Sequence, residues 1–269
     1  MPEDLFILKS WDEQIAVFND NLQIIRHKPT KNSVHDIRVS VKKLRSYLRL
    51  RQELTSEKWV DEFNNVKILF QTLAKERDFE MALSLLYRYQ RREKTSLPHF
   101  KKFLQASGRL TRRWSRQTSL DFNTEQLQAL TNSFHLSFSA LSDEQVINKI
   151  KELAPKVLKK VKKLASGLKK NIHEIRKLLK DLSYWLKACP ENPISEILKL
   201  KLLEKILDDI GRWQDHFIFL NKLKDFKKEF SVKGSNEFLG IKTCEEKIRK
   251  NQDELLNKIK IRGAIIFLK

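Results

Sequence analysis

Two segments of this chain place histidine, arginine and lysine at one spacing, H-x-x-R-x-x-x-K. They contain His35, Arg38 and Lys42 in the first, and His173, Arg176 and Lys180 in the second. At 100° per residue, these positions lie on one face of a helix. An arginine can engage two phosphoryl oxygens with its planar fork, and a lysine adds a mobile point charge. Each face therefore suits a phosphate-rich anion.

Further cations extend both faces. These are Arg45 and Arg49 on the first, and Lys169 and Lys187 on the second. An ordinary solvated helix face mixes glutamate with lysine four residues away, whereas these cations repel one another by about 0.2–0.5 kcal/mol per pair. An ordinary solvated face remains the alternative, but the same strain in two equivalent places favours an anionic ligand that relieves it. The two histidines either donate to that ligand or are neutral groups bonded to the backbone.

The two segments belong to an internal repeat. An offset of 138 residues aligns them, together with apolar positions such as Leu44 with Leu182. A second pair of blocks, beginning at Leu69 and Ile206, repeats at an offset of 137 and aligns Asp78 with Asp215. Two blocks in the same order indicate a duplication. We expect two similar helical bundles related by a pseudo-two-fold axis.

Composition favours helices and a polyanionic partner. The chain has 269 residues, 41% of them hydrophobic, with only six glycines and six prolines, which is typical of long helices around a real core. Its 54 basic and 34 acidic residues give a net charge of +20, which attracts polyanions.

The periodicity predicts helices over 9–27, 32–54, 57–91, 97–117, 144–166, 169–188, 193–229 and 239–260. We expect a single domain, 1–269, in which the polar stretch 118–143 connects the half-repeats 1–125 and 144–269. Residues 261–269 fit either a helix end or an extended tail.

Other basic segments add to this charge. Arg109, Arg112, Arg113 and Arg116 share a helical face, and we expect them to contribute to binding. Seven lysines lie between Lys156 and Lys170 without an acid, and they either extend a groove or only raise solubility.

The sequence gives little support for catalysis or a metal site. It has no glycine-rich phosphate loop and no zinc-ligand spacing, and Asp78 and Asp215 are expected to orient basic side chains or to cap helices. Trp114, Trp185 and Trp213 are expected in the core. The two cysteines are far apart in the sequence, which predicts that they form no disulfide. The N-terminus is acidic and the chain lacks a long apolar run, so we expect a cytoplasmic protein without a membrane partner. No cofactor is expected.

The paired histidine segments, each followed by a helix that ends near L-x-x-x-R-D or I-G-x-x-x-D, resemble the CHAD domain (conserved histidine α-helical domain). The resemblance spans nearly the whole chain. It implies an all-α fold of two four-helix bundles and non-enzymatic binding of inorganic polyphosphate in a basic groove or pore, with association with polyphosphate granules. It adds Lys43 and Arg77 to the ligand-facing residues. Two positions depart from the pattern, because Ser183 replaces an expected arginine and Asp181 stands where the first repeat has Lys43.

Two other functions remain open at this point. The same charge permits a sequence-neutral nucleic-acid-binding protein, and a phosphohydrolase or polyphosphate kinase would need a carboxylate cluster that the sequence does not indicate.

Overall fold

The computed structural model describes residues 5–59, 63–196, 198–229 and 236–267, and over these ranges the regular elements are helices without a strand. They are α1 (Phe6–His27), α2 (Lys31–Thr55), α3 (Asn64–Glu93), α4 (Pro98–Leu120), α5 (Thr124–Phe138), α6 (Asp143–Ala165), α7 (Leu168–Ala188), α8 (Leu200–Glu229) and α9 (Asn236–Phe267). The all-helical fold class predicted from the sequence is confirmed.

Local sequence signals explain several helix ends. Thr30 begins α2 with a capping box that it shares with Ser33, and Ser142 does the same for α6 with Gln145. Ser56 and Lys94 adopt left-handed conformations, with φ of 63° and 47°, and thereby end α2 and α3. Local signals therefore explain both ends of α2 and the C-terminal end of α3.

The structure corrects three of the expected ranges. The stretch 118–143 is not only a connector, because it contains α5, whose Leu127, Leu130 and Phe134 are buried. The third helix begins at Asn64 rather than at residue 57. The helix expected from residue 193 begins at Leu200, because Asn192 holds a turn in which its side chain donates to the Leu198 carbonyl at 3.0 Å.

The structure also tests the predictions for the C-terminal residues and for the burial of three tryptophans. The chain is helical through Phe267, and residues 268–269 lie outside the described residues. Trp185 and Trp213 are buried as predicted, but the prediction for Trp114 was wrong, because 49% of this side chain is exposed on α4. Both cysteines are free and buried.

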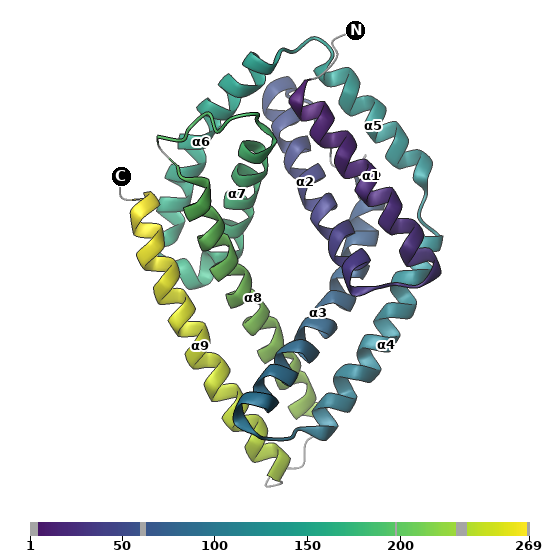
Figure 1. Ribbon diagram of the computed structural model, residues 1–269, viewed down its shortest axis with the longest axis vertical. Coiled ribbons are helices and arrows are strands. Elements are labelled where there is room, and N and C mark those ends of the chain that lie inside the picture. Colours follow the sequence, from purple (N-terminus) through teal and green to yellow (C-terminus); the bar gives the residue numbers. More distant parts are fainter. Residues whose placement is uncertain (1–4, 60–62, 197, 230–235, 268–269) are drawn as a thin grey trace.

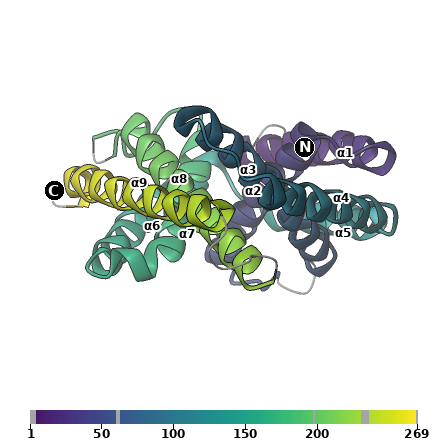
Figure 2. The same ribbon diagram turned by 90° about the horizontal axis from the view of Figure 1, so that it is seen from below.

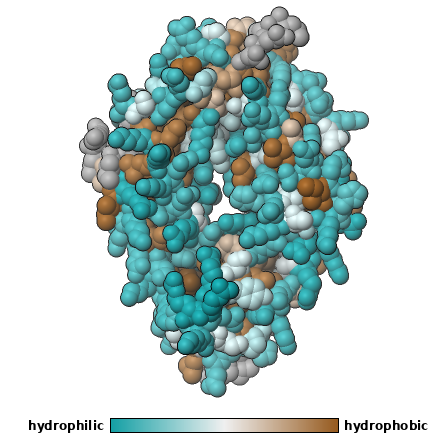
Figure 3. Space-filling view, viewed as in Figure 1, coloured by the Kyte–Doolittle hydropathy of each residue, from teal (hydrophilic) through white to brown (hydrophobic). Residues whose placement is uncertain are grey.

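The helices form two halves that lie side by side (Figures 1 and 2). Helices α1–α5 make one half and α6–α9 the other, and they meet where α2 packs against α7 and α3 packs against α8. The space-filling view is largely hydrophilic and is hollowed between the halves (Figure 3). Among the described helices, none combines the length and the apolar character that crossing a membrane requires.

Two apolar cores stabilise this arrangement, and each contains residues from both halves. The larger one includes Trp11 of α1, Leu48 of α2 and Leu182 of α7. The smaller one lies where α3, α4, α8 and α9 meet, with Phe100, Phe219 and Phe226 at its centre. Polar groups near the junction of the halves are therefore positioned by packing on both sides.

Candidate functional site

Helices α2 and α7 bring the two H-x-x-R-x-x-x-K faces together at the junction of the halves. Two interhelical hydrogen bonds fix their relative position: Trp185 Nε1 donates to the Ser46 carbonyl at 2.9 Å, and Ser46 Oγ donates to the Asp181 carbonyl at 3.2 Å. Beside them, α3 contributes Arg77. We call Arg38, Lys42, Arg77, Arg176 and Lys180 the central cation cluster, because repulsion from each of the other four contributes to lowering the pKa of Lys42.

Lys42 shows the electrostatic state of the cluster most clearly. Burial lowers the pKa of its ammonium group to about 7, and repulsion from Arg38, Arg176, Arg77 and Lys180 adds to this effect. The largest electrostatic contributions to the shift all come from cations. A lysine that is surrounded by cations and largely removed from water favours an anion that would restore its charged form.

Arg38 is held by the protein backbone and by an aromatic ring. Its Nη1 donates to the Phe70 carbonyl at 3.1 Å, and its guanidinium carbon lies 4.5 Å from the centroid of the Phe70 ring. Burial lowers the pKa of Arg38 to about 10, an effect that Asp78 opposes. The guanidinium is thus fixed before any ligand arrives.

Arg176 is the counterpart of Arg38 on α7. Its Nε is buried without a hydrogen-bond partner within the described residues. Burial lowers its pKa, and repulsion from Arg77 contributes to the shift. A buried donor without a partner is unfavourable, so an oxygen-rich ligand that reached this group would satisfy it.

Asp78 and Asp215 orient Arg77. Arg77 Nη2 lies 2.7 Å from Asp215 Oδ1, across the contact between α3 and α8, and Arg77 Nη1 lies 3.6 Å from Asp78 Oδ1. This is the positioning role predicted from the sequence. Over the described ranges, no group of three His, Cys, Asp or Glu side chains is arranged to hold a metal ion.

The two histidines lie at the exposed edge of the cluster. Burial lowers the pKa of His35, and repulsion from Lys42, Arg77 and Arg38 acts in the same direction. His173 Nδ1 is 3.3 Å from Gln214 Nε2 of α8. Both side chains remain accessible, so a ligand entering the cluster would pass them.

A cavity of about 200 Å³ adjoins the cluster. Its cationic lining comes from both halves: Lys42, Arg45, Arg49, Arg176, Lys177 and Lys180. Arg49 is not free, however, because its Nη1 lies 2.5 Å from Asp181 Oδ1. Lys180 faces the Tyr184 ring at 5.5 Å, and burial raises the pKa of Asp181 to about 6.

The remaining predicted residues lie away from the cluster or have protein partners. Lys187 forms an ion pair with Glu204, and Lys43 is half-buried with Lys187 and Glu13 as its charged neighbours. Lys169 is exposed on the first turn of α7. Ser183, at the position of the missing arginine, is 2% exposed.

The four arginines of α4 do not share one role. Arg112 pairs with Glu76 at 3.1 Å and with Glu80 at 2.6 Å, and thereby joins α4 to α3. Arg116 Nε donates to the Arg26 carbonyl at 2.9 Å. Arg109 and Arg113 are exposed on the outer surface of α4.

Sequence reasoning missed the aromatic and acidic partners of these cations. Phe70 follows Leu69 among apolar residues, so the pattern predicts that it packs in the core. In the structure, its ring lies beneath the guanidinium of Arg38. The sequence shows Asp181 only as a difference from the first repeat. Its pairing with Arg49 could not be predicted, because the two residues are 132 positions apart.

Comparison with known proteins shows the family and the fold of this chain. A model of the CHAD domain matches residues 9–223. The crystal structure of the CHAD domain from the plant Ricinus communis is similar over 96% of this chain and 90% of that chain, with a TM-score of 0.74 and 15% identity. PptA from Streptomyces chartreusis is similar over 98% of both chains, with a TM-score of 0.66 and 14% identity. The search of curated proteins finds no match.

Proposed function

This chain belongs to the CHAD domain family, and we propose that it binds inorganic polyphosphate at the central cation cluster without transforming it chemically. The observation that carries the proposal is the environment of Lys42, whose pKa is lowered to about 7 by burial and by four neighbouring cations. A linear chain of phosphates supplies closely spaced negative charges, which matches cations contributed by both α2 and α7.

Binding rather than turnover is supported by the roles of the carboxylates. Asp78 and Asp215 face Arg77, and this arrangement leaves them as partners of a cation rather than as a pair that would hold Mg²⁺. We therefore propose a non-enzymatic role in the cytoplasm, in which the protein associates with polyphosphate granules. Release of phosphate from polyphosphate in the presence of Mg²⁺ would contradict this part of the proposal.

Inorganic polyphosphate is favoured over nucleic acid by the aromatic residues of the site. Phe70 lies beneath Arg38, and Tyr184 is only 8% exposed, so neither offers an open face for base stacking. The exposed Trp114 lies on α4, away from the cluster lining. A sequence-neutral nucleic-acid-binding protein is the alternative that the experiment below tests.

We also propose that the halves arose by duplication and are related by a pseudo-two-fold axis, with the four-helix units α1–α4 and α6–α9 as the repeats and α5 as an additional helix between them. Residues separated by about one repeat meet each other along the junction. Phe6 N donates to Asp143, Arg77 pairs with Asp215, and His99 pairs with Glu237, at separations of 137, 138 and 138 residues. Equivalent positions meet in this way when they lie close to a two-fold axis.

The experiment is a competition titration at physiological ionic strength, where weak surface electrostatics are screened. Labelled long-chain polyphosphate is bound and challenged with single-stranded DNA, RNA and heparin at matched charge. The variant Arg38→Ala/Arg176→Ala is expected to weaken binding by about 100-fold, since two charge-assisted contacts are lost. Lys224→Ala/Lys228→Ala removes the same charge from exposed sites on α8 and should change affinity by less than about threefold.

Two results would contradict the proposal. Equal displacement by nucleic acid would show a general polyanion-binding protein. Equal weakening by both double variants would show that net charge, rather than the central cation cluster, determines binding.

A further inference from the structure

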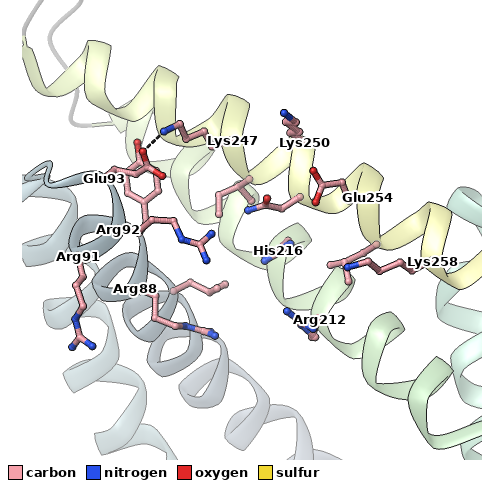
Figure 4. Close-up of a pocket in the computed structure, with 15 residues that line it drawn as sticks. Arg88, Arg91, Arg92, Glu93, Arg212, His216, Lys247, Lys250, Glu254 and Lys258 are labelled. Atoms are coloured by element: carbon pink, nitrogen blue, oxygen red, sulfur yellow. Dashed lines mark hydrogen bonds and ion pairs between the residues drawn. The ribbon is translucent and has the colours of Figure 1, made fainter.

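A second basic cavity lies outside the central cluster. It has a volume of about 680 Å³ and lies between the C-terminal part of α3 and helices α8 and α9 (Figure 4). We call it the α3–α9 pocket. It shares no lining residue with the cavity beside the central cluster. Its size falls within the range of small-molecule sites.

The charges around the pocket are unbalanced. Seven arginines and lysines line it, against the two carboxylates Glu93 and Glu254. Lys247 forms an ion pair with Glu93 and so joins α9 to α3 at one end of the pocket. Within the described part of the chain, the other six cations have no carboxylate within ion-pair distance.

Three of these arginines surround one histidine. Figure 4 shows Arg88 and Arg92 extending from α3 toward the space around His216, with Arg212 on the next turn of α8, whereas Arg91 points away. His216 Nδ1 is buried and has no hydrogen-bond partner within the described residues. Repulsion from Arg212 and Arg88 adds to the burial that lowers the pKa of His216, which Asp215 opposes.

Part of the pocket lining is apolar. Leu85, Tyr89, Ile248 and Leu255 line the pocket and are buried. An apolar wall limits the water that can screen the arginines, so their interaction with an anion is stronger than on an open surface. The pocket thus combines unpaired guanidinium groups, an unsatisfied ring nitrogen and partial exclusion of water.

We infer that the α3–α9 pocket is a second anion site, which takes a compact ligand bearing several linked phosphate groups. Arg88, Arg92 and Arg212 bind phosphoryl oxygens, and His216 gains the hydrogen-bond partner that it lacks. Inorganic oligophosphate and a nucleoside triphosphate share this chemistry. This site is independent of the proposed polyphosphate function, because the two cavities have separate linings.

The test measures binding of inorganic tripolyphosphate and, separately, of ATP to the full chain by calorimetry at physiological ionic strength without added metal. It is performed in the Arg38→Ala/Arg176→Ala background, so that the central cation cluster does not contribute. We expect binding to persist there and to weaken at least about tenfold when Arg88→Gln/Arg212→Gln is added. Adding Lys224→Gln/Lys228→Gln instead, which removes the same charge, should change affinity by less than about twofold.

A second readout keeps the test independent of folding effects. Histidine NMR titration should show that tripolyphosphate raises the pKa of His216, a resonance identified by its loss in His216→Gln. If ATP binds with an affinity comparable to that of tripolyphosphate, the pocket accepts nucleoside triphosphates. If only tripolyphosphate binds, the ligand of the pocket is an inorganic oligophosphate. Loss of all binding in the Arg38→Ala/Arg176→Ala background, or an unchanged His216 pKa, would overturn the inference and leave the polyphosphate proposal intact.

Discussion

Arg49 of α2 and Asp181 of α7 form an ion pair of 2.5 Å that crosses from one half of the chain to the other. Asp181 is buried, and burial raises its pKa to about 6 despite the neighbouring guanidinium. It occupies the repeat position at which the first half has Lys43. The carboxylate therefore holds one of the cavity's arginines in an internal contact.

Replacing Asp181 with asparagine should increase affinity for long-chain polyphosphate by about three- to tenfold. The amide preserves the shape of the side chain but removes the negative charge that competes with the ligand for Arg49. Titration of labelled polyphosphate measures the change. Asp225→Asn, at an exposed site on α8, is the matched control. Equal gains in both variants would show a net-charge effect, and no gain would show that Arg49 does not reach the ligand.

Polyphosphate binding should take up protons near neutral pH. The pKa of Lys42 is about 7 in the unliganded protein, and a nearby phosphate favours the charged ammonium group. Affinity should therefore fall as the pH rises from 6 to 8, with uptake of about half a proton by Lys42 at pH 7. Calorimetry in buffers of different ionisation enthalpy measures this uptake.

Lys42→Arg separates Lys42 from the histidines in that experiment. Arginine stays charged, so the uptake that remains in the variant belongs to groups such as His35, whose pKa is lowered. An identical uptake in wild type and Lys42→Arg would contradict the assignment to Lys42.

The unliganded protein should be more stable without the Lys42 charge. The folded pKa of about 7 lies below the ordinary value of 10.5, so the unfolded chain holds more protons between these values. The free energy of unfolding should consequently rise with pH across this window, and the penalty should be complete below pH 7. Lys42→Met should raise the free energy of unfolding by about 1–2 kcal/mol at pH 7. Chemical denaturation measures it, with Lys224→Met as the control, and a lower stability of Lys42→Met would refute this interpretation.

Arg112 should matter for stability rather than for binding. It pairs with Glu76, which is fully buried, so Arg112→Ala leaves that carboxylate without its cation and should lower the free energy of unfolding by about 2 kcal/mol. Combining it with Glu76→Gln should restore much of the loss. Thermal unfolding measures both variants, with Arg109→Ala as the exposed control. A polyphosphate affinity reduced by Arg112→Ala but not rescued by Glu76→Gln would instead indicate ligand contact.

The sequence was sufficient for the all-helical fold class. Helical periodicity also places His35, Arg38 and Lys42 on one helix face, because this depends only on spacing within one helix. The same reasoning failed for 118–143, where polar residues on the outer face conceal the apolar positions of α5. It also placed Trp114 in the core, since the pattern does not reveal which helix faces remain uncovered.

Pairing between distant residues could not be predicted from the sequence. Arg112 and Arg109 are three positions apart on one helix, yet only Arg112 meets Glu76 and Glu80 of α3. Likewise, the α3–α9 pocket arises from helices that are separated by more than 100 residues. Such contacts depend on how the helices pack, which no local motif specifies.

Cations that repel one another at the junction until an anion binds have a consequence for how fast the protein is degraded in the cell. A ligand that binds only the folded chain stabilises it in proportion to the logarithm of its concentration. Proteases act on the opened chain, so occupancy of this junction lowers the fraction available for degradation. On the proposed function, a cell rich in polyphosphate would keep more of this protein, and a depleted cell would lose it without any change in synthesis.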